Sequence, residues 1–187
     1  MCPNFIFGGY HLTEETTRKQ ELMDKAYALG FEYEKTYKGC AQCAFAALQD
    51  ALGKRNAETD AIFQSLTGMA GGGAREGDGS CGAYVGASAF FGYVLGRSRD
   101  DFADPAKIRL KTFAMVKKLH DKFVDKYGTP VCHPIHRKLY GRPFYIADAD
   151  EFAKFEAAGA HDSGCTGVVG DTARWAVEIL ADEGLVP

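Results

Sequence analysis

The sequence predicts an all-α protein, a single compact bundle of about six to eight helices formed by residues 1–187. Apolar residues recur at helical spacing along most of the chain. No run alternates apolar and polar residues well enough to predict a strand. A chain of 187 residues, 46% of them hydrophobic, can bury a core without covalent cross-links. The cysteines are therefore free for another role.

Four helices are predicted in the first half of the chain. The first runs from residue 13 to about residue 31. The second has the clearest pattern, because small and apolar side chains stay in helical register over residues 40–52. A third, shorter helix covers about residues 59–67, and an uncharged fourth covers residues 81–96 with Ser80 as its expected N-cap.

Two glycine patterns in this half predict close backbone contacts. The glycine-rich segment 68–79 breaks regular structure and lacks the ending of a phosphate-binding P-loop, so we expect a hinge or close-approach loop that brings Cys81 to other backbone. Arg75 within it is expected to face solvent. In the uncharged helix, Gly82 and Gly86 place small residues on one face, where we expect another helix to pack closely.

The second half predicts four more helices. A long amphipathic helix is expected to open at Asp104-Pro105 and to end near Tyr127, with Phe113 among its core residues. A short helix carrying Cys132 follows Thr129-Pro130. The last two are expected over residues 148–158 and from about residue 164 to residue 182.

The charge balance and the termini exclude several classes of protein. The 22 Lys and Arg residues against 25 Asp and Glu give a net charge of −3, which argues against a nucleic-acid-binding protein. The longest uncharged run, residues 81–96, is shorter than the roughly 18 residues that cross a bilayer, so we expect no membrane span. Without a recognisable signal peptide, the expected compartment is the cytoplasm, where thiols stay reduced.

Four of the six cysteines occupy equivalent positions, each at the expected start of a helix. Unpaired N–H groups at a helix start favour an anion, so we expect these thiols to have lowered pKa values. Such sulfurs can hold an iron–sulfur cluster or another thiophilic metal, or can exchange electrons by forming disulfides. Their separations match no local cluster-binding motif, so only the fold could bring them together. These four helix-start cysteines are Cys40, Cys81, Cys132 and Cys165.

The remaining cysteines and the histidines leave alternatives open. Cys40 and Cys43 form a CxxC at a helix start, which is the expected exchanging pair if the protein is an oxidoreductase, although Cys43 also fits the apolar face of a core helix. Cys2 is expected to have no role. His133 and His136 follow Cys132 and would suit zinc or a base, but on a short surface helix we expect them to be solvated.

The segments CAQCAFAALQDALG (residues 40–53) and CGAYVG (residues 81–86), followed by single cysteines at 132 and 165, resemble the C_GCAxxG_C_C family of redox-active proteins. The resemblance covers about residues 37–180 and implies a small, helical, cytoplasmic protein whose partner is an oxidoreductase or a transporter. Split-Soret cytochromes have similar cysteines and an associated iron–sulfur cluster. The chain lacks their CxxCH haem site, so the haem role is not carried over.

Three functions therefore remain in view. The first is electron transfer or redox sensing through an iron–sulfur cluster held by the four helix-start cysteines, in contact with a redox partner protein. The second is a thiol–disulfide oxidoreductase that uses Cys40 and Cys43. The third is a non-catalytic binding module whose small-residue helix faces form a homodimer.

Overall fold

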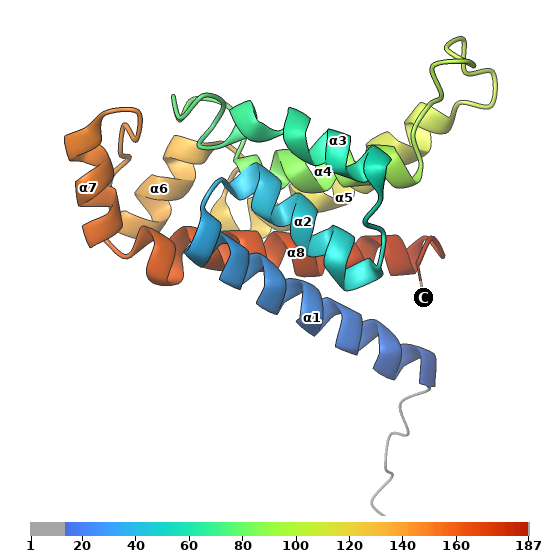
Figure 1. The fold of residues 1–187 in the computed structure, drawn as a ribbon, viewed down its shortest axis with the longest axis horizontal. Coiled ribbons are helices and arrows are strands. Elements are labelled where there is room, and N and C mark those ends of the chain that lie inside the picture. The colour runs from blue at the N-terminus through green and yellow to red at the C-terminus, as the bar shows by residue number, and fades with distance from the viewer. Residues whose placement is uncertain (1–13, 187) are drawn as a thin grey trace, which may run out of the picture.

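The computed structural model describes residues 14–186, and these residues contain helices, turns and loops but no strand, which confirms the all-α prediction (Figure 1). Cys2 and the expected helix start at Thr13 lie outside the described residues. The helices are α1 (Glu14–Tyr37), α2 (Cys40–Leu52), α3 (Ala57–Ser65), α4 (Gly82–Val94), α5 (Ile108–Tyr127), α6 (Cys132–Tyr140), α7 (Ala149–Ala157) and α8 (Cys165–Asp182).

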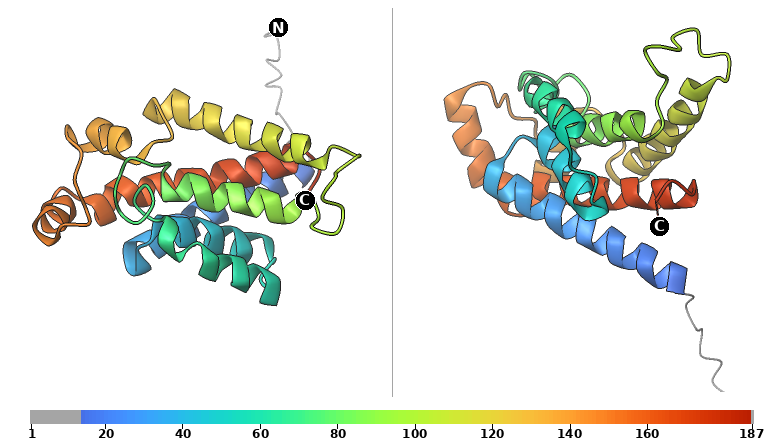
Figure 2. Two further views of the ribbon diagram at one scale, coloured as in Figure 1. Left: turned by 90° about the horizontal axis from the view of Figure 1, so that it is seen from above. Right: turned by 45° about the vertical axis from the view of Figure 1, so that its right-hand side comes forward.

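The helices surround one large core, with a smaller cluster at one end. Helices α1 and α8 run in opposite directions along each other (Figure 1). Seen from above, α4 and α8 lie between α5 on one side and α2 with α3 on the other (Figure 2). Buried residues of these helices form the main core. The smaller cluster contains Phe144, Ile146, Phe155 and Ala160, and α6 and α7 lie at that end of the molecule.

Glycines allow α4 to approach α2 closely, as expected from their spacing. A Cβ on Gly86 would lie 2.2 Å from the carbonyl oxygen of Ala41, which is closer than any real contact. A Cβ on Gly82 would lie 2.9 Å from the Ala41 nitrogen. The backbone of α4 therefore packs directly on the first turn of α2.

Several predicted boundaries were wrong. Helix α1 extends beyond residue 31 to Tyr37. Cys81, not Ser80, is the N-cap of α4, because Ser80 pairs with Val131 in an isolated β-bridge. Helix α5 begins at Ile108 rather than at residue 104, because the Asp104 carboxylate accepts a hydrogen bond of 2.7 Å from the Ile108 N–H and thereby caps the helix from outside.

The core expected in α5 was only partly right. Met115, Leu119 and Phe123 are buried. Phe113, expected in the core, is 61% exposed. Within residues 14–186, none of the helices combines the length and the apolar composition that crossing a bilayer requires.

Candidate functional site

Four helix starts meet at one cavity. Cys40, Cys132 and Cys165 are the first residues of α2, α6 and α8, and Cys81 is the N-cap of α4. All four line the same cavity of about 500 Å³, and all four are free thiols. The fold thus brings together sulfurs that are far apart in the sequence.

The glycine-rich loop positions two of these cysteines side by side. The Cys81 N–H donates to the carbonyl oxygen of Pro130 at 2.7 Å, and the Cys132 N–H donates to that of Gly79 at 3.0 Å. A Cβ on Gly79 would lie 2.3 Å from the carbonyl oxygen of Gly72, so the loop folds tightly on itself. The loop is therefore a close-approach element, as expected, and it joins the start of α4 to the start of α6.

Another close contact fixes Cys165. The residues before α8 form a π-helical turn, Ala160–Gly164, and a Cβ on Gly164 would lie 1.9 Å from the hydroxyl oxygen of Tyr140. That hydroxyl donates a hydrogen bond to Cys165 Sγ at 3.6 Å. Glycine at position 164 thus lets a tyrosine of α6 reach the sulfur at the start of α8.

The cavity wall is mostly apolar, with a few charged groups. Its apolar residues include Ile135, Ile146, Phe152, Phe155, Val168 and Val169. Its titratable groups, besides the thiols, are Glu34, Lys38, Arg75, His136 and His161. Such a wall limits contact between the sulfurs and water, which strengthens electrostatic effects inside the cavity.

For three of the four helix-start cysteines, the lowered thiol pKa expected from the helix start is wrong. A hydrogen bond with Cys81, followed by burial, raises the pKa of Cys40 well above its ordinary value. Burial raises the pKa of Cys132 and of Cys165. Partial charge at a helix start is too weak to offset the desolvation of a thiolate among other sulfurs. Without a cation in the cavity, Cys40, Cys132 and Cys165 stay protonated at neutral pH because of these raised pKa values.

Cys43 packs in the main core and not against the cavity. Its side chain is 4% exposed within the main core, and its Sγ donates to the carbonyl oxygen of Lys38 at 3.2 Å. Burial and the charge of Glu34 raise the pKa of its thiol. Cys43 is not among the residues that line the cavity.

His136 belongs to the site, although its position on a short helix had indicated a solvated ring. It is only 2% exposed, and its Nε2 lies 3.5 Å from Cys132 Sγ, one helical turn away. Burial, with the charge of His133, lowers the pKa of His136 to about 4, so its ring is neutral at pH 7. His133 points elsewhere, with Nε2 3.0 Å from the carbonyl oxygen of Phe144.

A chain of ionic contacts at the cavity, which begins at a buried glutamate, was not predicted from the sequence. Glu34 is 3% exposed, and its Oε1 lies 3.5 Å from His161 Nε2. His161 Nδ1 lies 2.7 Å from Glu156, which also accepts a hydrogen bond of 2.6 Å from Lys38. Burial alone would lower the pKa of His161, but Glu34 and Glu156 outweigh it and raise the pKa above the ordinary value.

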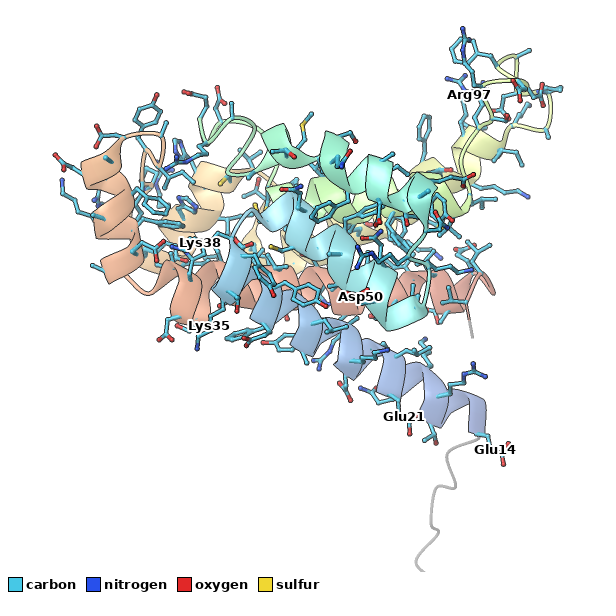
Figure 3. All side chains as sticks on the ribbon, in the orientation of Figure 1. Glu14, Glu21, Lys35, Lys38, Asp50 and Arg97 are labelled. Carbon is cyan, nitrogen blue, oxygen red and sulfur yellow. The ribbon has the colours of Figure 1, made fainter. Side chains whose placement is uncertain are left out.

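Arg75 is exposed, as expected, but it also lines the cavity and so lies at the cavity mouth. Its guanidinium lies 5.0 Å from the ring centroid of Phe152 and donates a hydrogen bond to the carbonyl oxygen of Ile146. Lys38, which follows the last residue of α1 and is labelled in Figure 3, lies over the same ring at 5.2 Å. The glycine-rich loop is therefore tied across the mouth to α7 and the segment before it.

The four sulfurs line a cavity and do not converge on the position of a single ion. In the part of the chain that the structure describes, no three His, Cys, Asp or Glu side chains are arranged to hold a single metal ion. The arrangement instead offers thiols around a cavity, which can surround a larger group or can react in pairs.

Comparison with known proteins gave one match. The model of a family described as "Putative redox-active protein (C_GCAxxG_C_C)" matches residues 38–179, close to the region of resemblance expected from the motifs. The matched region includes all four helix-start cysteines. No curated protein and no solved structure matches the chain.

Proposed function

This chain belongs to the C_GCAxxG_C_C family, and from that premise we propose that it transfers or senses electrons through an iron–sulfur cluster held by the four helix-start cysteines. The observation that carries the proposal is that four free thiols from four separate helices line one cavity. Four cysteine sulfurs are the usual ligand set of a cluster, and a cluster supplies one-electron transfer when it is bound.

The donor set and the surroundings fit such a group. Sulfur ligands select iron–sulfur clusters or other thiophilic metals. The cavity volume of about 500 Å³ leaves space between the sulfurs for more than one metal atom. The N–H groups at the helix starts favour negative charge on the ligands, and the apolar wall keeps water from them.

The raised thiol pKa values add a requirement. Because the thiols of Cys40, Cys132 and Cys165 hold their protons in the metal-free protein, metal binding must displace those protons. Iron uptake should therefore release protons and should be favoured by high pH. Glu34, whose charge raises the pKa of Cys40 and of Cys165, is close enough to add negative charge beside the site.

The setting of this activity follows from its chemistry. Free thiols need reducing conditions, so we place the protein in the cytoplasm. A protein that only carries electrons needs a redox partner, and we expect an oxidoreductase or a transporter in that role, with a homodimer as the assembly to test.

Anaerobic reconstitution with iron and sulfide tests the proposal. We expect the wild-type chain to become coloured and to retain iron and sulfide after desalting. Alanine at any one of the four helix-start cysteines should lower the retained iron. Cys43→Ala is the matched control and should bind iron like the wild type, because Cys43 lies outside the cavity lining. Wild-type protein that stays colourless and iron-free after reconstitution would overturn the proposal.

The alternative oxidoreductase based on Cys40 and Cys43 has less support. Cys43 Sγ contacts the Lys38 carbonyl oxygen within the core rather than the cavity. An exchange reaction needs both sulfurs to be reached by a substrate disulfide.

A further inference from the structure

We propose that Cys40 and Cys81 form a reversible disulfide when the metal-free site meets a small peroxide, and that this disulfide and metal binding exclude each other. The first part concerns the protein without metal and stands by itself. The second part rests on the proposed function, because it assumes that both sulfurs are cluster ligands.

The packing of α2 against α4 brings these two cysteines together. A Cβ on Gly82 would lie 2.4 Å from Cys40 Sγ, so the sulfur rests directly on the glycine that follows Cys81. One turn further along α4, Gly86 allows the same close approach to Ala41. The two thiols are close enough to form a hydrogen bond with each other.

The other cysteines are engaged elsewhere. Cys43 Sγ donates to the Lys38 carbonyl oxygen, Cys132 Sγ faces His136 at 3.5 Å, and Cys165 Sγ accepts from Tyr140 at 3.6 Å. Each of these contacts would have to break before the sulfur could join a disulfide. Cys40 and Cys81 already share a hydrogen bond, and Cys40 has one further hydrogen bond, with the Gly71 backbone.

Both sulfurs line the cavity, so hydrogen peroxide that enters it meets the pair. One of the two thiols loses its proton, and its sulfur attacks one oxygen of the peroxide; the O–O bond breaks, and hydroxide leaves as water after taking that proton. The resulting sulfenic acid then condenses with the other thiol, forming the S–S bond and releasing a second water. Two thiols are oxidised by two electrons, and one peroxide is reduced to two waters.

Mutual exclusion with metal follows from the chemistry of the sulfurs. A disulfide sulfur is no longer a thiolate, so the oxidised site has lost two of its four ligands. A sulfur bound to metal is in turn not free to condense with its neighbour. Peroxide would thus convert an empty site into a form that cannot take up iron until a thiol reduces it.

Peptide mapping of the metal-free, full-length chain tests the disulfide. The reduced protein is treated with hydrogen peroxide, remaining thiols are alkylated, and the protein is digested and analysed without reductant. We expect the Cys40 peptide to be linked to the Cys81 peptide, and dithiothreitol to reverse the link. Cys43→Ala should give the same link. A dominant Cys40–Cys43 link, or oxidation to sulfinic acid without any link, would overturn the proposal.

A second arm tests the exclusion and separates it from the proposed function. Protein oxidised by peroxide is reconstituted with iron and sulfide before and after treatment with dithiothreitol. We expect iron uptake only after reduction. If the reduced protein also takes up no iron, the proposed function is wrong, and the peptide map still shows whether the Cys40–Cys81 disulfide forms. Equal iron uptake by both samples, with the link intact, would overturn the exclusion. Neither Cys40→Ala nor Cys81→Ala should form this link, whether iron is present or absent. Thermal unfolding checks that both variants are folded.

Discussion

Cys40 Sγ lies 2.4 Å from the position that the Cβ atom of any other residue would take in place of Gly82. This distance is too short for a real contact. The backbone on either side leaves no alternative, because the Ala41 nitrogen is 2.9 Å and the Met69 carbonyl oxygen is 3.0 Å from the same point. The glycine after Cys81 therefore sets how closely the starts of α2 and α4 approach.

Gly82→Ala should push these helix starts apart. Overpacking of this kind costs about 1–3 kcal/mol in the free energy of unfolding. We also expect less iron after reconstitution and less cross-linking of Cys40 to Cys81, because both need the sulfurs at their present distance. Urea unfolding and the two assays of the site measure these effects.

Gly92→Ala in the same helix is the matched control. No atom lies within 4 Å of the added Cβ, so the substitution should stabilise α4 by up to about 1 kcal/mol and leave the site unchanged. If both glycine variants lost stability and iron binding equally, close packing at Gly82 would not be the reason.

The sequence was informative about the sulfurs and poor about what surrounds them. Helix starts at Cys40, Cys132 and Cys165 could be predicted because glycine, proline and apolar spacing mark them locally. The lowered pKa values were wrong because burial, which depends on the whole fold, outweighs the local helix charge.

The burial of Glu34 and His136 also depends on the whole fold and was not predicted from the local sequence. Both are charged or polar residues that composition assigns to the surface, yet both are buried against the cavity. A signal for Glu34 was present, because Ala26 and Gly30 precede it at four-residue spacing and all three are buried on α1. His136, one turn after Cys132, had the spacing of a residue on the same helix face.

Tyr140→Phe should change the properties of Cys165 without disturbing the fold. The Tyr140 hydroxyl opposes the effect of burial and lowers the pKa of Cys165, so its loss should slow alkylation of Cys165 in the metal-free protein. A hydrogen bond to a ligand sulfur also favours the reduced cluster. We expect the reduction potential of the reconstituted protein to become roughly 20–60 mV more negative.

Tyr145→Phe provides the comparison, because Tyr145 is exposed and its hydroxyl bonds to Glu76 outside the cavity. Redox titration followed by absorption should give the wild-type potential for this variant. An unchanged potential in Tyr140→Phe would show that its hydroxyl does not act on the sulfur in the loaded protein.

The contribution of His161 to the stability of the metal-free protein should be larger in mild acid than at high pH. Its folded-state pKa is raised above the ordinary 6.5 by Glu34 and Glu156, against the opposing effect of burial. The protonated ring therefore stabilises the fold fully below the unfolded-state pKa, and this contribution is lost as the pH rises through the folded-state pKa.

The difference in unfolding free energy between wild type and His161→Gln isolates this contribution. The difference should be largest below about pH 6, under the unfolded-state pKa, and should shrink as the pH rises through the raised folded-state pKa. A difference that grew with rising pH would contradict the assignment of a raised pKa to His161.

Arg75→Ala should open the cavity mouth. The Arg75 side chain stacks on Phe152 and bonds to the Ile146 carbonyl oxygen, so it ties the glycine-rich loop to α7 and the segment before it. Losing these contacts should favour local opening by about 1 kcal/mol, which corresponds to a roughly fivefold faster reaction of the cavity thiols with a bulky maleimide.

Arg142→Ala is the control. It removes a similar stack, since Arg142 lies 4.0 Å from the Phe144 ring centroid, but Arg142 does not line the cavity. The cavity thiols of Arg142→Ala should react with the maleimide at the wild-type rate. If the reaction were equally faster in both variants, a general loosening of the fold, and not the Arg75 contact, would control access to the sulfurs.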